Sequence, residues 1–218
     1  MSDARLAIVG AGGHARCVAE TAVLAGWKVV AFLVDIELPT DESAVAMPAP
    51  VLFDPDPLGR IRAEGIDNVA IAIGNCAARH RFATAALDGG LALPVLRHPS
   101  AIVSASARVE AGAFLSAGCV VQPAASIGMA TIVNTSASVD HDCVLGDAVH
   151  ICPGTHLAGD VRIGHRSWIG IGSCVVERRS IGADCLVGAG SVVVRDLPDG
   201  SRAWGNPARI QVARRNNP

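Results

Sequence analysis

Residues 127–151 read Ile127-Gly-Met-Ala-Thr-Ile-Val133-Asn-Thr-Ser-Ala-Ser-Val139-Asp-His-Asp-Cys-Val-Leu145-Gly-Asp-Ala-Val-His-Ile151, with an aliphatic residue at every sixth position. The same period runs from residue 101 to residue 196 without a break. Neither an α-helix nor a single strand produces a period of six. A short fixed repeat is typical of a solenoid, and this one is typical of a parallel β-helix built from hexapeptide repeats. The sixteen aliphatic positions are Val103, Val109, Leu115, Val121, Ile127, Val133, Val139, Leu145, Ile151, Leu157, Ile163, Ile169, Val175, Ile181, Val187 and Val193.

A second position of the repeat carries small residues. Four residues after the aliphatic one, most repeats have Ala, Cys, Ser or Thr, which fit a narrow interior. Cys119, Cys143 and Cys185 fall on this position, so we expect them to be small buried hydrophobic residues. The seven cysteines form no C-x-x-C pair, which argues against both a disulfide framework and a structural zinc site.

The composition narrows the class of protein. Half of the 218 residues are hydrophobic, only 3% are aromatic, and there is no tyrosine, which suits a narrow aliphatic interior. The net charge of −2 gives no reason to expect binding to nucleic acid or to an anionic membrane. The first residues do not resemble a signal peptide, and no apolar run is long enough to span a membrane. We therefore expect a soluble, cytoplasmic protein.

The region before the repeats alternates between strand and helix patterns. Residues 6–9 read as a buried strand, residues 10–14 as a tight loop, residues 15–24 as a helix and residues 28–34 as a second strand. This order predicts an α/β, Rossmann-like domain with a mainly parallel, doubly wound sheet. The further expected elements are strands at 51–53, 68–73 and 93–96 and helices at 57–64 and 76–87. The sequence thus divides into an α/β domain (1–97), a β-helix (98–196) and a C-terminal tail (197–218).

A ligand-binding crevice is expected at one edge of this sheet. The loop matches G-x-G-x-x-A at Gly10, Gly12 and Ala15, where close backbone approach and free helix N–H groups favour a phosphate. Ligands of such sheets bind beyond the carboxyl ends of the strands. The loop alone leaves a nicotinamide-dependent oxidoreductase open. The candidate residues at these strand ends are Gly12, Gly13, His14, Asp35, Gly74 and Asn75.

His141 is the clearest exception to the repeat pattern. Three repeats make one coil, so residues 18 apart stack, and Pro123 and Gly159 become the neighbours of His141. His141 lies two residues after the inward Val139, on a corner, so its ring should project outward beside a glycine that leaves room for a substrate. The flanking Asp140 and Asp142 could bind a ring nitrogen and raise its basicity. An ordinary exposed histidine on a polar corner stays open.

A zinc site and a cysteine nucleophile are two other kinds of chemistry that these residues could support. His141, His150, His156 and His165 could hold a zinc ion between subunits, but their spacing contains no H-x₄-H pair. Cys143 could act as a nucleophile activated by His141. Cys143 lies on an inward position and His141 on a corner, so we expect them to be apart.

Several motifs, taken together, resemble the nucleotide-sugar and sialic-acid acetyltransferase family of left-handed β-helix proteins. The resemblance covers nearly the whole chain. It implies a left-handed β-helix, acetyl-CoA as co-substrate, no metal, and a homotrimer with active sites between subunits. The motifs are Ile8-Val-Gly-Ala-Gly-Gly-His14, Ile71-Ala-Ile-Gly-Asn75, Asn134-Thr-Ser-Ala-Ser-Val-Asp-His-Asp-Cys143, His150-Ile-Cys-Pro-Gly154 and Gly205-Asn-Pro-Ala-Arg209.

The resemblance also implies roles for individual residues. His141 would be the general base, Asp142 the acid that raises its basicity, and His150 a neighbour of the acetyl thioester. Ile171 and Ala189 would contact acetyl-CoA through their backbones, and the N-terminal crevice would hold a sugar nucleotide rather than NAD. We add the hypothesis that the N–H of Gly159 donates to the tetrahedral oxyanion.

The expected function is therefore acetyl transfer to the amine of a nucleotide-linked amino sugar for surface-polysaccharide synthesis, by direct attack. O-acetylation of a sialic acid is the alternative within the family. A γ-type carbonic anhydrase and a non-catalytic trimeric binding module are the alternatives outside it.

Overall fold

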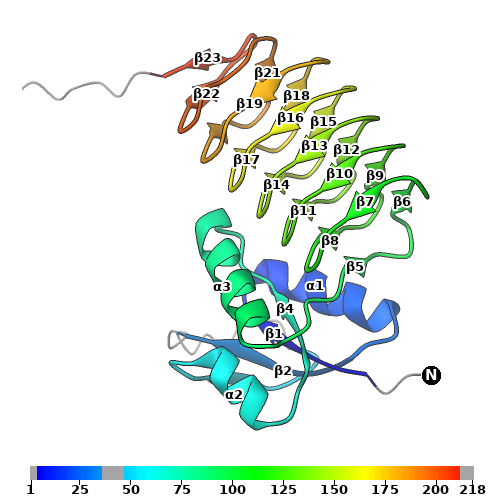
Figure 1. Cartoon of the computed structure of the whole chain (residues 1–218), viewed down its shortest axis with the longest axis vertical. Helices are drawn as coiled ribbons and strands as arrows, with labels where there is room; N and C mark the ends of the chain where they lie inside the picture. Colours follow the sequence, from blue (N-terminus) through cyan, green and yellow to red (C-terminus); the bar gives the residue numbers. More distant parts are fainter. Residues whose placement is uncertain (1–3, 36–46, 212–218) are drawn as a thin grey trace, which may run out of the picture.

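The computed structural model describes residues 4–35 and 47–211. It consists of an N-terminal α/β part followed by a long stack of short strands (Figure 1). Within the described residues, no helix is long and apolar enough to cross a membrane.

The N-terminal part is a parallel four-stranded sheet with the order β3-β2-β1-β4. The apolar run after Ala4 forms β1 because its residues are buried on both faces, as is usual in parallel sheets. The elements, in chain order, are β1 (Arg5–Val9), α1 (Gly13–Leu24), β2 (Lys28–Val34), β3 (Val51–Phe53), α2 (Pro57–Ala63), β4 (Asn68–Ile71) and α3 (Cys76–Asp88).

Helices cover both faces of this sheet. Ala15, Val18 and Ala22 of α1 pack with Leu6 and Ile8 of β1 on one face. On the other face, α2 and α3 pack against the remaining apolar residues of β1 and β2. The mainly parallel, doubly wound α/β arrangement predicted from the strand–helix alternation is therefore confirmed.

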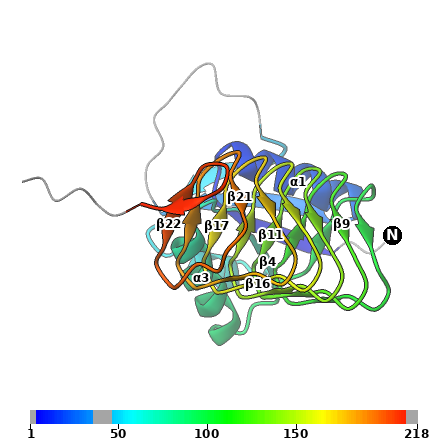
Figure 2. The ribbon, with the colours of Figure 1, turned by 90° about the horizontal axis from the view of Figure 1, so that it is seen from above.

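The second part is a parallel β-helix in which the predicted repeat is confirmed. Strands three apart in sequence pair in parallel, and each pair is offset by 18 residues, as for Val133 with Ile151. Three sheets result, of five, eight and six strands (Figures 1 and 2). The strands are β5 (Leu96–Arg97), β6 (Ile102–Val103), β7 (Arg108–Val109), β8 (Phe114–Leu115), β9 (Val120–Val121), β10 (Ser126–Ile127), β11 (Ile132–Val133), β12 (Ser138–Val139), β13 (Val144–Leu145), β14 (His150–Ile151), β15 (His156–Leu157), β16 (Arg162–Ile163), β17 (Trp168–Ile169), β18 (Cys174–Val175), β19 (Ser180–Ile181), β20 (Leu186–Val187), β21 (Val192–Val193), β22 (Arg202–Trp204) and β23 (Arg209–Ile210).

The interior of the β-helix is filled as the repeat requires. The aliphatic residue that ends each strand from β6 to β21 points inward, and Ile151 and Ile169 are fully buried. Cys119, Cys143 and Cys185 are also buried, as predicted. The corners turn through left-handed backbone conformations, including non-glycine residues such as Ala130 and Ala148. Side chains at the corners are therefore directed outward, while the strands supply the core.

The α/β part is docked on the eight-stranded sheet. Phe114 of β8 and Ile132 of β11 belong to the same apolar cluster as Val18 and Ala19 of α1. Figure 1 shows α1 and α3 next to this sheet. The outward side chains of this sheet, together with corner residues such as Ala130, therefore meet the α/β part.

Two predictions at the ends of the β-helix were wrong. The strand expected at 93–96 is β5, which pairs with β8 and so begins the β-helix instead of ending the α/β sheet. The coils also continue past residue 196, because Leu197 bridges Ile181 and β22 pairs with β20. The hexapeptide count misses this coil because its offset from the coil below is 16 residues instead of 18.

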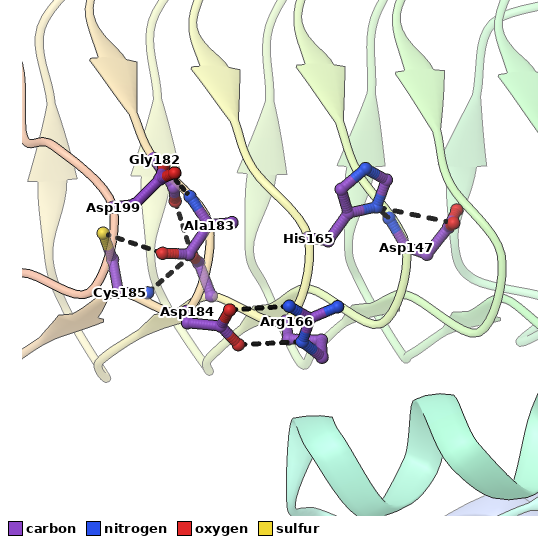
Figure 3. A network of polar contacts seen from close by, with 9 residues as sticks. Asp147, His165, Arg166, Gly182, Ala183, Asp184, Cys185 and Asp199 are labelled. Atoms are coloured by element: carbon purple, nitrogen blue, oxygen red, sulfur yellow. Dashed lines mark hydrogen bonds and ion pairs between the residues drawn. The ribbon is translucent and has the colours of Figure 1, made fainter.

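Side-chain contacts at one corner connect this shorter coil, and the coils before it, to their neighbours. The carboxylate of Asp199 accepts a hydrogen bond from the backbone N–H of Ala183 at 2.8 Å. One coil below, Arg166 and Asp184 form a two-bond ion pair, and His165 accepts from the N–H of Asp147 at 3.0 Å (Figure 3). Each contact joins consecutive coils, so the corner remains continuous although the repeat length changes.

Candidate functional site

His141 lies on the corner between β12 and β13, with its ring projecting from the β-helix. Its side chain is 60% exposed, as the repeat position predicted. Nδ1 lies 2.7 Å from Oδ2 of Asp142. Asp140 instead accepts from the backbone N–H of His141 at 2.8 Å, so of the two flanking acids only Asp142 holds the ring. A carboxylate at Nδ1 favours the tautomer with the proton on Nδ1, which leaves Nε2 as a free acceptor.

The surroundings of His141 make it a stronger base. The hydrogen bond that His141 donates to Asp142 is the largest cause that raises the pKa of His141 above the ordinary 6.5, and the charges of Asp140, Asp142 and Asp160 act in the same direction. The ring opens on a cavity of about 590 Å³ whose wall includes Gly159, Asp160 and Arg162. His141 is therefore an accessible imidazole with raised basicity beside a space for substrate.

Gly159 lies directly over the His141 ring, as the stacking count predicted. A Cβ built on Gly159 would lie 2.5 Å from Cε1 and 2.6 Å from Nε2 of His141. Only glycine at this position leaves the ring where it is. The N–H of Gly159 has no acceptor among the described residues, so it can donate to a bound group.

His150 belongs to a second group of residues, on the outer face of the eight-stranded sheet. The Asn134 amide oxygen accepts from the N–H of Thr135 at 2.8 Å, which directs its nitrogen to Nε2 of His150 at 3.1 Å. His150 Nε2 is then an acceptor, and its proton is on Nδ1. The ring of Trp168 lies above, with a centroid distance of 4.2 Å.

This group lines an apolar groove of about 430 Å³. The groove contains the predicted acetyl-CoA residues His150, Ile171 and Ala189, so the structure brings these three together. Trp168 and Asn134 also line it. The sequence analysis gave neither a role, although Asn134 stands in one of the motifs and Trp168 is a rare aromatic at an outward strand position.

His14 approaches the same group from α1. Its ring centroid lies 6.4 Å from that of His150 and 5.3 Å from that of Phe114. Burial, followed by the charge of Arg79, lowers the pKa of His14 to about 4. Burial also lowers the pKa of His150 to about 3, with Arg79 and His14 adding to the effect. Both rings are therefore neutral at pH 7, and Nε2 of His14 and Nδ1 of His150 are buried without a hydrogen-bond partner in the described structure.

The third group is the crevice at the carboxyl ends of the N-terminal strands. Gly12 and Asp35 line a cavity of about 300 Å³, together with Arg81 and Phe82 of α3, which the sequence analysis did not single out. The guanidinium of Arg81 lies 5.6 Å from the centroid of the Phe82 ring.

The other predicted crevice residues have different positions. Asn75 caps α3 by accepting from the N–H of Ala78 at 2.9 Å, and Gly74 precedes it. Gly13 is the first residue of α1. The prediction that His14 lines the crevice is corrected, because its ring turns away from the strand ends and lies against His150 and Phe114.

The alternative chemistries find little support in the geometry. Sγ of Cys143 is buried and points to the carbonyl of Ala158 at 3.2 Å, away from the exposed His141 ring. Burial also raises the pKa of the Cys143 thiol, which disfavours a thiolate. In residues 4–35 and 47–211, no group of three or more His, Cys, Asp or Glu side chains is arranged to hold a metal ion.

Within one chain, the His141 corner is separate from the other two groups. The residues around the His141 cavity come from the corner between β12 and β13 and from the coils below and above it. The groove at His150 and the crevice at Gly12 share no residue with that cavity. The chain therefore carries an exposed imidazole beside a cavity on one corner and two further cavities elsewhere.

Comparisons with known proteins fit this arrangement. A family model described as the PglD N-terminal domain matches residues 5–86. The structure superimposes with a TM-score of 0.88 on a histidine-to-alanine variant of GDP-perosamine N-acetyltransferase from Caulobacter crescentus in complex with CoA and GDP-perosamine. The two sequences are 40% identical, and the match covers 95% of this chain and 96% of that one.

Two further acetyltransferases are similar to this chain. The acetyltransferase domain of PglB from Neisseria gonorrhoeae, in complex with acetyl coenzyme A, is 39% identical with a TM-score of 0.86, covering 96% of this chain and all of that one. The GDP-perosamine N-acetyltransferase of Escherichia coli O157:H7 is 33% identical over 145 residues. That match covers 64% of this chain and 65% of the length of the relative.

Proposed function

This chain belongs to the left-handed β-helix family of sugar N-acetyltransferases and is an acyltransferase with acetyl-CoA as co-substrate, and on that premise we propose that it acetylates the amine of a nucleotide-linked deoxyamino sugar. The observation that carries the proposal is the contact of 2.7 Å between Nδ1 of His141 and Asp142, which leaves Nε2 free beside an open cavity. An amine must lose a proton when it becomes an amide, and this pair supplies a base.

The proposed reaction is a direct attack of the sugar amine on the thioester carbonyl of acetyl-CoA. Nε2 of His141 takes the proton that the amine nitrogen loses, a step typically worth about 10²–10⁴ in rate. Asp142 orients the ring and stabilises the imidazolium. The tetrahedral intermediate then collapses, the C–S bond breaks, and CoA leaves as the thiol after it receives the proton. No covalent enzyme intermediate is required.

Gly159 is the proposed oxyanion donor. Its N–H is adjacent to the His141 ring and has no other acceptor in the described residues. A donor aimed at the developing negative oxygen is typically worth on the order of 10²–10³ in rate. A bound tetrahedral mimic whose oxygen pointed away from this N–H would contradict the assignment.

Acetyl-CoA and the sugar nucleotide are assigned to the two remaining surfaces. The apolar groove with His150, Ile171 and Ala189 suits the pantetheine arm and the acetyl group. The crevice with Gly12 and Asp35 at the strand ends suits the nucleotide. We assign Gly13, Gly74 and Asn75, at or just before the starts of α1 and α3, to contacts with the sugar. This assignment follows a division into an α/β domain that ends before β5 and a β-helix that runs from β5 to β22.

A second copy of the chain is part of the proposal. Since the His141 corner shares no residue with either binding surface of its own chain, a complete site requires that corner to meet the groove of a neighbour. We propose a homotrimer in which each active site lies between two subunits. Gel filtration with light scattering tests this, and a monomer with full activity would contradict it.

GDP-perosamine, acetylated at its C4 amine, is the substrate we favour, since relatives 40% and 33% identical carry that name. O-acetylation of a sialic acid or another sugar is the alternative within the same site. The test is the thermal stabilisation by GDP-, UDP-, dTDP- and CMP-sugars with CoA present. A GDP-sugar should raise the unfolding temperature most. If a CMP-sugar does so instead, the O-acetylation alternative holds.

A further inference from the structure

The strongest unexplained feature outside these three groups is a buried arginine between the α/β part and the β-helix. Arg79 is 1% exposed and is the largest fully buried side chain in the described structure. Among the described residues no carboxylate pairs with it. We propose that Arg79 is a positioning residue, which locks the sugar-nucleotide crevice at a fixed distance and angle to the acetyl-CoA groove.

The hydrogen bonds of Arg79 join the two parts of the molecule. On the crevice side, Nη1 donates to the carbonyls of Ile73 and Gly74, both at 2.8 Å. Ile73 itself lines the crevice. On the β-helix side, the guanidinium donates to two coils. These bonds run from Nε to the carbonyl of Ala130 at 2.8 Å, and from Nη2 to the carbonyls of Ala148 at 2.8 Å and Val149 at 3.3 Å.

The β-helix presents these carbonyls because of how its corners turn. Ala130 and Ala148 have φ values of 53° and 51°, and their carbonyls do not take part in the coil-to-coil ladder of the described residues. The carbonyl of Val149 accepts a hydrogen bond from Arg79, and Val149 directly precedes His150 in the chain. A planar guanidinium with five N–H groups in a fixed fork can satisfy acceptors in several directions, which a lysine cannot do. The contact therefore selects arginine by geometry.

Burying this side chain is costly, which indicates a role beyond packing. Removing an ion from water costs several kcal/mol unless hydrogen bonds compensate. The buried face of α3 consists of Cys76, Arg79, Ala83 and Ala86, so an apolar residue at position 79 would suit the helix. An apolar residue would, however, leave the carbonyls of Gly74, Ala130 and Ala148 without these donors, so the guanidinium is needed for the bridge itself.

The charge acts on the two histidines nearby. The groups that act on these rings are Arg79 for both, and His14 and the backbone of Gly74 for His150. Arg79 is the only permanent cation among them, and it lowers the pKa of both rings in addition to burial. Burial keeps both rings neutral and Arg79 adds to this effect, so that both act as hydrogen-bonding groups beside the acetyl group.

The experiment compares Arg79→Met with Arg97→Met. Arg97 is a matched control, because its guanidinium also donates to a backbone carbonyl, that of Ala101, but it joins no two domains. Three quantities are measured on each folded variant: kcat and KM with acetyl-CoA and the sugar nucleotide, the Kd of CoA by calorimetry, and the pKa of His150 by NMR.

For Arg79→Met we expect kcat to fall about 100-fold, the effect typical of a misplacement near 1 Å. The Kd of CoA should stay within about threefold, since the groove lies on the β-helix alone. The pKa of His150 should rise above about 3 but stay well below 6.5, because burial, the larger cause of its low pKa, remains. Arg97→Met should leave all three quantities unchanged. If Arg79→Met does not fold, Arg79→Lys, which keeps a cation without the fork, should show the loss in kcat with a smaller change in the pKa.

The proposal is overturned if a folded Arg79→Met variant keeps kcat within twofold, or if its loss in kcat is matched by an equal loss in CoA affinity. It rests on the proposed function for the kinetic readout only. If the wild-type protein acetylates no sugar nucleotide, the proposed function fails, while an unchanged His150 pKa in Arg79→Met would independently refute the role of Arg79.

Discussion

The substitution Gly159→Ala tests the geometry of the proposed base by adding one methyl group beside the His141 ring. The added Cβ would lie 2.5 Å from Cε1 and 2.6 Å from Nε2 of His141, well inside van der Waals contact. The backbone of Gly159 is not in the left-handed region, so alanine fits its conformation. The His141 side chain is 60% exposed and can swing outward. We therefore expect the His141 ring to be displaced and the backbone of residue 159 to keep its position.

The magnitude follows from what the displaced ring loses. Swinging outward breaks the contact of 2.7 Å with Asp142 and removes Nε2 from the amine. If the full contribution of a general base is lost, kcat falls by about 10²–10⁴, equivalent to about 2.7–5.4 kcal/mol of transition-state stabilisation. The N–H of residue 159 is retained, so this loss reports on the ring and not on the oxyanion donor. The stability of the fold should change by less than about 1 kcal/mol, as is usual for surface substitutions.

The assay is continuous detection of the CoA thiol released at saturating substrates, together with thermal unfolding. Gly200→Ala is the control, because a Cβ there meets no atom within 4 Å, and its positive φ of 69° is close to that of several corner alanines. The control should keep wild-type kcat. If Gly159→Ala keeps kcat within threefold of wild type while a crystal structure shows the ring displaced, the base assignment is refuted.

Three further outcomes are expected. Asp142→Asn, which suits the positive φ of that corner, removes the largest cause that raises the pKa of His141. In the wild type, kcat/KM should decrease as the pH drops through the His141 pKa, which lies above 6.5, because the base becomes protonated. In Asp142→Asn this decrease should occur at a lower pH. An unchanged pH dependence would contradict the pairing. Ile151→Ala removes a fully buried aliphatic residue from the β-helix and should cost about 2–5 kcal/mol in urea denaturation, whereas a loss under about 1 kcal/mol would argue against the packed interior. Cys143→Ala should keep kcat within twofold, and a large loss, or a burst of CoA release without acceptor in the wild type, would point to an acyl-cysteine.

The fold was predictable because the six-residue repeat reflects which side chains fit inside the coils. A coil of fixed length places the same repeat position inside at each turn, so the aliphatic residues, the inward cysteines and the outward His141 all followed from counting. The count failed where the coil length changes. The last coil is offset by 16 residues, and the sequence has no mark that distinguishes a shortened coil from a tail.

The site was predictable only in part, for a physical reason. Position along a regular repeat determines which residues share a vertical line, and this brought Gly159 to His141 and Ile171 to Ala189. It does not determine how a separate domain docks. The proximity of His14 to His150 and the burial of Arg79 both arise at that docked surface. Arg79 did leave one signal, since a lone charge stands in the buried stripe of α3.

The most direct test of the central claim is acetylation of GDP-perosamine with acetyl-CoA by the wild-type protein and by His141→Asn, with the product identified by mass spectrometry and NMR. We expect the wild type to place a single acetyl group on the C4 amine, and a folded His141→Asn that still binds CoA to do so at a rate at least about 100-fold lower. Near wild-type turnover by His141→Asn would contradict this expectation.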